Sequence, residues 1–322
     1  MPLLAIALAA VTLAGCKKRT TDAIAVIPKG TTHEFWKSVH AGAEKAAQET
    51  GVNIIWKGPL REDDREDQVK VVETFTNMRV KGIVLAPLDD TALVPAVTDA
   101  VRAGIPVVAF DSAIKTDEIV SFVATDSYRG GTLAGEHLAK LLGDKGKVMM
   151  LRYAQGSAST AERERGFLEA IAAHKGIEVV SDNQYGGVTT ESAFKASENL
   201  LSSHKGPGGL TVQGIFCPNE STAFGMLRAL EDDGFAGKVA FVGFDSSPKL
   251  VDALGKGYMN ATVVQDPIRM GYLAVKALVD HLQGKPVDKR IDTGATLITR
   301  DAMSTPAAQA LLNPDFKKWL KE

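Results

Sequence analysis

The feature that most constrains the fold is a repeated alternation between short β-branched segments and longer amphipathic segments. The first series reads as strands at residues 24–27, 53–56, 82–86 and 106–110, separated by helices at 35–49, 64–78 and 91–102. A second series reads as strands at 147–151, 177–180, 214–216 and 239–242, separated by helices at 160–173, 191–203 and 221–232. This order is typical of βαβ units, which form parallel sheets covered by helices. The sequence therefore predicts an α/β protein with two doubly wound parallel-sheet lobes.

Polar side chains follow several of the predicted strands directly. They are Lys29, Asp111, Ser112, Asn219, Asp245 and Gln265. Any one of them alone is explained as well by a helix N-cap or a loop contact. Their recurrence favours a binding site, because ligands of open parallel sheets bind beyond the carboxyl ends of the strands. Carboxylates, amides and a cation around one crevice suit a neutral polyhydroxylated ligand, and Phe35 and Trp36 supply an apolar face for a sugar ring.

The N-terminal residues indicate export. An apolar run at residues 2–13 is shorter than the roughly 20 residues of a membrane-spanning helix, and it ends in Leu-Ala-Gly-Cys before the basic residues 17–19. This pattern is typical of a cleaved signal, and Leu-Ala-Gly-Cys resembles the lipobox of bacterial lipoproteins. We therefore expect residues 1–16 to be a lipoprotein signal peptide ending at a lipidated Cys16. The protein is then periplasmic or at the cell surface, held to the membrane by the lipid alone; the alternative is a buried N-terminal strand or helix.

Composition argues against several other classes of protein. The formal net charge is −2, and no basic cluster occurs beyond residues 17–19, which argues against a nucleic-acid partner. The chain has two cysteines. With Cys16 lipidated, Cys217 is left without a disulfide partner and is expected at the end of a buried strand.

The sequence lacks the motifs of common enzyme classes. His33-Glu34 is followed by Lys37 where a zinc protease needs a second His, and no phosphate-binding loop or nucleophile elbow occurs. Asp89 and Asp90 are interpreted as caps of the next helix rather than as a glycosidase pair, and the charge run at 62–67 as a solvated helix start. We expect no catalytic activity, no cofactor and no metal site.

Five segments carry a more specific signal: residues 105–111, 163–167, 216–220, 242–245 and 261–265. Together they resemble bacterial periplasmic sugar-binding proteins of the ribose type, the type I substrate receptors of ABC importers, which share their fold with LacI effector domains. The resemblance covers nearly the whole chain after the signal. It implies ligand contacts from Phe35, Trp36, Asp111, Arg163, Asn219, Asp245 and Gln265, with His33 where the ribose proteins carry an Asn.

Two positions depart from the ribose-type pattern. Ser112 stands where those proteins carry a sugar-binding Arg, and Lys29 where they carry a small polar residue. The pairing of Lys29 with Asp111 is instead similar to rhamnose and autoinducer-2 receptors, although Arg163 differs from the autoinducer-2 branch. The identity of the sugar stays open.

The resemblance also implies how the molecule is divided. We expect a three-crossing hinge, with one lobe at residues 22–125 plus 266–292 and the other at 126–265 plus 293–322. A monomer of this kind captures a monosaccharide or related polyol by lobe closure and delivers it to an ABC permease. The alternative is a sugar or autoinducer-2 receptor that presents its closed form to a chemoreceptor or sensor kinase. A LacI-like repressor is disfavoured, because the export signal stands where a helix-turn-helix would have to be.

Overall fold

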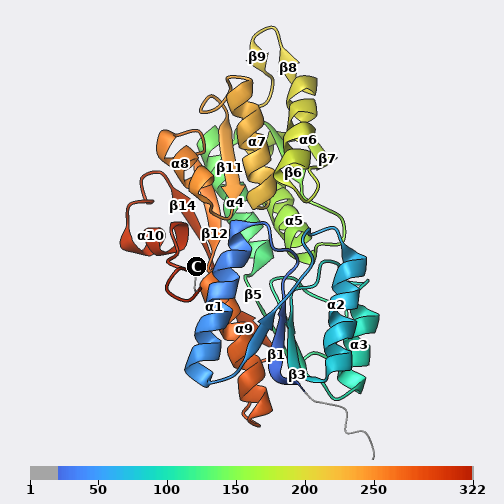
Figure 1. Cartoon of the computed structure of the whole chain (residues 1–322). Helices are drawn as coiled ribbons and strands as arrows, with labels where there is room; N and C mark the ends of the chain where they lie inside the picture. Colours follow the sequence, from blue (N-terminus) through green and yellow to red (C-terminus); the bar gives the residue numbers. More distant parts are fainter. Residues whose placement is uncertain (1–20, 321–322) are drawn as a thin grey trace, which may run out of the picture.

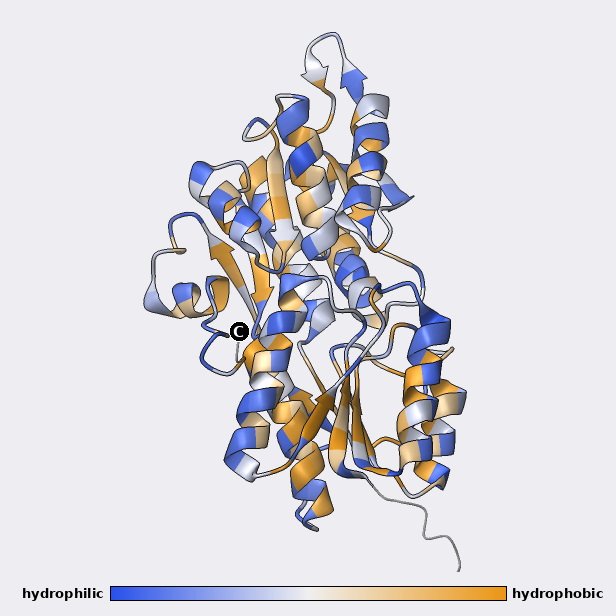
Figure 2. Cartoon of the chain, in the orientation of Figure 1, coloured by the Kyte–Doolittle hydropathy of each residue, from blue (hydrophilic) through white to orange (hydrophobic). Residues whose placement is uncertain are grey.

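The computed structural model describes residues 21–320, so the expected signal peptide and Cys16 lie outside the described residues. Two six-stranded sheets form the framework, one in each half of the molecule (Figure 1). Apolar residues gather on the strands and on the inward faces of the helices, whereas polar residues cover the outside (Figure 2). This distribution is expected for parallel sheets that bury both faces under helices.

The first sheet has the order β2-β1-β3-β4-β5-β13, and all its strands are parallel. The strands are β1 (Thr21–Ile27), β2 (Ile54–Trp56), β3 (Val80–Leu85), β4 (Val107–Phe110), β5 (Ser121–Ala124) and β13 (Arg290–Asp292). Helices α1 (Glu34–Thr50) and α9 (Pro267–Leu282) pack on one face, and α2 (Arg65–Met78) and α3 (Val94–Arg102) pack on the other. Helix α9 belongs to this half although it follows the strands of the second sheet in sequence.

The second sheet has the order β7-β6-β10-β11-β12-β14. Its strands are β6 (Lys145–Arg152), β7 (Gly176–Tyr185), β10 (Gly214–Phe216), β11 (Ala240–Phe244), β12 (Ala261–Gln265) and β14 (Ala295–Thr299). Helices α4 (Ser127–Leu142) and α5 (Ala158–Ala173) cover one face; α6 (Thr190–Ser203), α7 (Glu220–Asp232) and α8 (Pro248–Lys256) lie on the other. A short hairpin of β8 (Lys205–Gly206) and β9 (Gly209–Leu210) and a last helix α10 (Pro306–Leu312) complete the chain.

These sheets confirm the predicted α/β fold with two parallel-sheet lobes. The chain crosses between the two halves three times, after β5, after β12 and between β13 and β14. The second sheet is not fully parallel, because its edge strand β14 pairs with β12 in the antiparallel direction. Strand β14 follows β13, an edge strand of the first sheet, after only two residues, so the chain passes directly from one sheet to the other.

Helices α4 and α5 approach each other closely enough to require glycine at their contact. A Cβ atom at Gly131 would lie 1.9 Å from the carbonyl oxygen of Arg163, well inside any real contact distance. Because Arg163 is on α5, this contact helps to set the position of its side chain. Within residues 21–320, no helix is both long and apolar enough to cross a membrane.

Candidate functional site

The carboxyl ends of the two sheets face a common cleft, where the predicted site residues converge. We use the name polar cavity for the space of about 30 Å³ there. All the predicted side chains except Ser112 line it: Lys29, His33, Phe35, Trp36, Asp111, Arg163, Asn219, Asp245 and Gln265. Residues that are far apart in sequence therefore meet because the strands that precede them end at the same edge of each sheet.

Asp111 and Asp245 occupy equivalent places in the two sheets. Asp111 follows β4 and Asp245 follows β11, and each backbone N–H donates to a carbonyl of the next strand, Val123 or Val263. Both have positive φ, 60° and 67°, in the left-handed region that is uncommon for residues other than glycine. Such conformations carry strain and occur often at binding sites, where they direct a side chain into a cleft.

Lys29 pairs with Asp111 on the side of the first sheet. The Lys29 Nζ lies 2.7 Å from the Asp111 carboxylate, and both residues are buried. The same Nζ donates to the hydroxyl oxygens of Ser159 at 3.1 Å and Ser157 at 3.4 Å, both from the other half of the molecule. Lys29 thus connects the two sides of the cleft.

Ser112 is absent from the lining of the polar cavity. Its hydroxyl oxygen accepts the backbone N–H of Ser159 at 3.0 Å, and the side chain is fully buried. The structure therefore places Ser112 in the contact between the two halves, at the first turn of α5, and does not bring it to the lining of the polar cavity.

His33 and Glu62 form a second charged pair. His33 Nδ1 lies 2.7 Å from the Glu62 carboxylate, which also accepts the Trp36 Nε1–H at 2.7 Å and the Tyr153 hydroxyl at 2.8 Å. Burial alone would lower the pKa of His33, but Glu62 raises it to about 9. Burial would likewise raise the pKa of Glu62, but protonated His33 lowers it to about 2. The pair is therefore ionised across the neutral range.

The position of Glu62 corrects one expectation. The charge run at 62–67 predicts a solvated helix start, yet the Glu62 side chain is only 7% exposed and lines the polar cavity. The loop that precedes α2 folds over the cleft, where Trp36 and Tyr153 satisfy the carboxylate. The prediction of solvent exposure holds for the other acidic side chains of residues 62–67, which remain at the surface.

Asp245 and Arg163 lie on the side of the second sheet. The Asp245 carboxylate accepts Gln265 Nε2–H at 2.7 Å and the backbone N–H of Glu220 at 3.0 Å. Arg163 donates from one terminal nitrogen to the carbonyl of Pro218 at 3.0 Å, and its guanidinium carbon lies 4.0 Å from the Phe244 ring centre. Its Nε is buried without a hydrogen-bond partner among residues 21–320. A buried donor of this kind is costly unless a bound molecule accepts from it.

Asn219 is both the N-cap of a helix and a residue of the polar cavity. Its Oδ1 accepts the backbone N–H of Thr222 at 3.2 Å, so it is the N-cap of α7 within a reciprocal capping box. The residue also lines the polar cavity.

Glu220 joins the two halves across the cleft. Its carboxylate accepts the backbone N–H of Phe35 at 3.2 Å and that of Glu34 at 3.4 Å, at the start of α1. Helix α1 has no side-chain cap from its own N-cap residue, His33. An acidic group at a helix N-terminus is favourable because it meets unsatisfied N–H groups and the helix dipole.

Sequence reasoning missed six residues that line the polar cavity: Glu62, Tyr153, Ser157, Ser159, Thr160 and Glu220. Tyr153 directly follows β6, so the rule that nominated the other strand-end residues applies to it as well. Glu220 is next to the nominated Asn219. Glu62 lies in a loop with no strand or motif beside it, and no local signal identifies it.

The arrangement suits a neutral ligand. Lys29, protonated His33 and Arg163 face Glu62, Asp111 and Asp245, and Glu220 lines the same cavity with its pKa raised to about 7, so charges of both signs surround the polar cavity. These groups donate to and accept from hydroxyls at several points. Within the described part of the chain, no group of three His, Cys, Asp or Glu side chains could hold a metal ion.

Two further interpretations can be compared with the structure. Cys217 is buried just after β10, as expected, and burial raises the pKa of its thiol. Asp89 accepts the backbone N–H groups of Thr91 and Ala92, so it caps the turn that leads into α3. Helix α3 begins at Val94, whereas the sequence predicted a start at residue 91.

Comparisons with known proteins agree with this geometry. Residues 24–286 match a family model described as a periplasmic binding protein domain. The chain is 30% identical over 282 residues to the ribose import binding protein of Escherichia coli, covering 87% of this chain and 91% of that protein. It is 31% identical over 276 residues to the D-allose-binding periplasmic protein of the same organism, covering 82% and 87%.

Solved structures show the same similarity. A carbohydrate transporter solute-binding protein from Agrobacterium radiobacter, in complex with D-arabinose, matches with a TM-score of 0.86 and 30% identity, over 90% of this chain and 98% of that one. An ABC transporter solute-binding protein from Agrobacterium vitis with bound D-fucose matches with a TM-score of 0.85 and 35% identity, over 90% and 99%.

Proposed function

Because the chain belongs to the periplasmic binding protein family, as a relative of the ribose-type receptors of ABC importers, we propose that it binds a monosaccharide or related polyol between its two lobes. From the same family membership we propose that the protein delivers the bound sugar to an ABC permease. The family consists of binding proteins rather than enzymes, so the polar groups in the cleft serve recognition.

The observation that carries the proposal is the composition of the polar cavity. Buried cations, carboxylates and amides from both lobes surround it, with Phe35 and Trp36 at one side. Sugar hydroxyls satisfy such groups in pairs, and an aromatic ring covers the C–H face of a sugar. The unpartnered Arg163 Nε is the clearest single donor for a ligand oxygen.

We further propose that the lobes comprise residues 22–125 plus 266–292 and residues 126–265 plus 293–322, and that they open and close about the three crossings. Ligand contacts from both lobes favour the closed form over the open one, which is a population shift. A lipid on Cys16 would hold the protein at the outer surface of a membrane, where a permease receives the sugar.

The first experiment is a thermal-shift screen of the protein without residues 1–16. The panel contains D-ribose, D-allose, D-arabinose, D-fucose, D-tagatose and myo-inositol, with amino acids as a second panel. Binding only to the native state stabilises it by about 2.7 kcal/mol at a hundredfold excess over Kd. A shift with amino acids and none with sugars or polyols would contradict the proposed function.

Two variants test the proposed site with a sugar from this panel. Asp245→Asn keeps the side-chain volume but loses the charge, so we expect a ten- to hundredfold weaker affinity, corresponding to about 1.5–3 kcal/mol for a hydrogen bond to a charged group. Lys29→Met should also weaken binding, whereas Lys140→Met, at an exposed position on α4, should not. Calorimetry measures the affinity of each variant. If Asp245→Asn and Lys29→Met both bind the sugar as tightly as the wild type, neither residue belongs to the site.

A further inference from the structure

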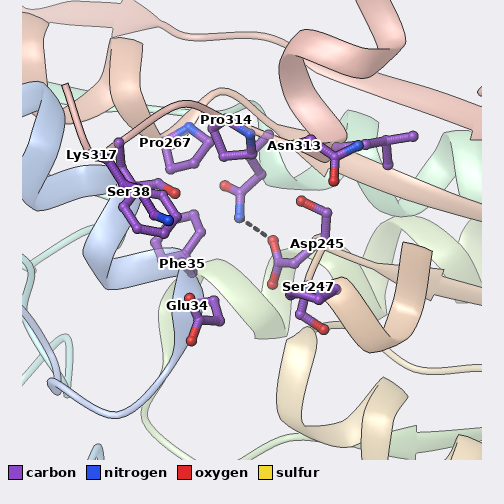
Figure 3. Close-up of a pocket in the computed structure, with 14 residues that line it drawn as sticks. Glu34, Phe35, Ser38, Asp245, Ser247, Pro267, Asn313, Pro314 and Lys317 are labelled. Atoms are coloured by element: carbon purple, nitrogen blue, oxygen red, sulfur yellow. Dashed lines mark hydrogen bonds between the residues drawn. The ribbon is translucent and has the colours of Figure 1, made fainter. Parts of the chain in front are cut away.

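A larger cavity adjoins the polar cavity on the side of α1, α8 and the C-terminal residues. We call this space of about 440 Å³ the tail chamber. In Figure 3, side chains from α1, from residues 245–247 and from the chain after α10 face it together. Phe35, Asp245 and Gln265 line both cavities. The Phe35 side chain and the hydrogen-bonded pair of Asp245 and Gln265 therefore form a boundary that the two cavities share.

The two cavities differ in chemistry. Buried charges surround the polar cavity, whereas much of the wall of the tail chamber is apolar: Phe35, Pro248, Pro267, Leu312, Pro314 and Phe316. The remaining wall carries mainly hydroxyl and amide groups, with two acidic side chains, Glu34 and the hydrogen-bonded Asp245, and one basic side chain, Lys317. Such a wall suits an uncharged group with apolar surface.

The chain after α10 closes the tail chamber and contacts both lobes. Helix α10 packs on the second lobe, where Leu312 joins a buried cluster with Val264 and Ile298. The following residues return to the first lobe, and the ring centre of Trp319 lies 5.7 Å from Lys45 Nζ on α1. The family match ends at residue 286, so this segment lies outside it. The tail chamber is therefore built partly from a segment that the family model does not include.

The sizes of the two cavities decide how they can be used. A water molecule needs about 10–15 Å³ of such space, so the polar cavity has room for a few hydroxyl groups rather than a whole sugar ring. The tail chamber falls within the range of about 300–1,000 Å³ that is usual for small-molecule sites. Because Asp245 and Gln265 line both cavities, a ligand that they hold can extend from the polar cavity into the tail chamber.

We propose that the ligand is an uncharged glycoside, whose hydroxyls reach the polar cavity and whose compact apolar aglycone lies in the tail chamber. This inference rests on the proposed function and specifies its substrate class. Contacts of the aglycone with Phe35, Pro248 and Phe316 then add to the hydrogen bonds of the sugar.

The test compares D-ribose, D-allose and D-fucose with their α- and β-p-nitrophenyl glycosides by calorimetry. We expect one p-nitrophenyl glycoside to bind at least tenfold more tightly than its free sugar. If the free sugars bind and no p-nitrophenyl glycoside binds more tightly, the inference about the tail chamber is wrong and the proposed function stands. If neither sugars nor glycosides bind, the proposed function fails, and this inference with it.

Variants of the tail chamber test whether the added affinity of the glycoside arises there. Ser247 lines the tail chamber and is buried, so Ser247→Phe places a ring inside it. This variant should weaken binding of the glycoside more than binding of the free sugar, and so lose the tenfold advantage of the glycoside. Phe316→Ala, which removes one wall, should reduce the advantage. The matched control is Ser202→Phe, at an exposed position of α6, which should change neither affinity. An advantage that survives in Ser247→Phe would overturn the inference.

Discussion

Glu220 is the residue whose ionisation is most directly coupled to contact between the lobes. Burial raises its pKa to about 7 in this arrangement, where it caps α1 of the other lobe. In the proposed open form the lobes are separated, so water reaches Glu220 and its pKa falls towards the ordinary value of 4.5. The closed form therefore binds the proton more tightly, and closure becomes more favourable as the pH falls from about 7 to about 4.5. Nearby His33 stays protonated in this range, because its pKa is about 9.

We therefore predict that sugar binding at pH 6 is accompanied by proton uptake. Calorimetry in buffers of different ionisation enthalpy measures this uptake directly. Glu220→Gln should abolish it, because the amide does not titrate, whereas Glu198→Gln, at an exposed position of α6, should leave it unchanged. Undiminished uptake in Glu220→Gln would assign the proton to another group.

The pair of His33 and Glu62 permits a second residue-scale prediction. Glu62→Gln removes the main charge that raises the pKa of His33 and leaves the burial that lowers it, so the pKa of His33 should fall well below its wild-type value of about 9 while Glu220 and Asp245 still act to raise it. NMR titration of the imidazole checks this shift, with Glu66→Gln, an exposed neighbour in α2, as the control. A His33 that is still protonated at pH 8 in Glu62→Gln would contradict the interpretation.

Loss of the charged partner should also reduce stability. Breaking a buried ion pair by removing one member costs about 3–5 kcal/mol. In the wild type, the raised pKa of His33 contributes stability that is complete below about pH 6.5 and is lost as the pH rises through about 9. The lowered pKa of Glu62 contributes stability that is complete above about pH 4.5 and is lost as the pH falls towards 2.

At the scale of elements, the contact between α4 and α5 links packing to the site. Gly131→Ala places a methyl group against the backbone of Arg163, so α5 must move away. We expect a loss of about 1–3 kcal/mol in the free energy of unfolding and a weaker affinity for the sugar, since α5 carries Arg163. Denaturant unfolding and calorimetry measure the two effects. Gly208→Ala, where no atom lies within 4 Å of the added Cβ, is the control and should change neither.

At the scale of the whole molecule, three crossings join lobes that also contact each other through side chains. Tyr153 reaches Glu62, Ser159 reaches Lys29, and Glu220 reaches the start of α1. Each contact pairs a group from one sheet edge with a group from the other. The proposed ligand contacts and the proposed lobe closure therefore involve the same residues, as a population shift between open and closed forms requires.

The proposed membrane anchor acts outside this body. Cys16 precedes the described residues, so Cys16→Ser should move the protein from the membrane fraction to the soluble fraction without changing its sugar affinity. Fractionation of cells that express the full chain tests this, with Cys217→Ser as the matched control, because the buried Cys217 thiol is not available for lipidation. Retention of Cys16→Ser in membranes would exclude a lipid on this residue as the anchor.

The sequence by itself determined the class of fold and nominated the main group of residues that line the polar cavity. The alternation of strands and helices depends on local periodicity, which is visible in a single chain, and the ends of parallel strands necessarily meet at one edge. Lys29, Asp111, Asn219, Asp245 and Gln265 could therefore be nominated from their places after strands, and the family resemblance added Arg163 and His33. The structure brings all of them to one cavity.

Only the tertiary structure decided which groups meet from different lobes and loops. Glu62 lies in a loop whose charge pattern predicts solvent exposure, yet tertiary contacts bury it beside His33. Glu220 caps a helix that is remote in sequence, and the chain after α10 closes the tail chamber. Spacing along the chain predicts local geometry because neighbouring residues share one element. It carries no information about which distant element will pack against it, since that choice depends on the shape and burial of the whole molecule.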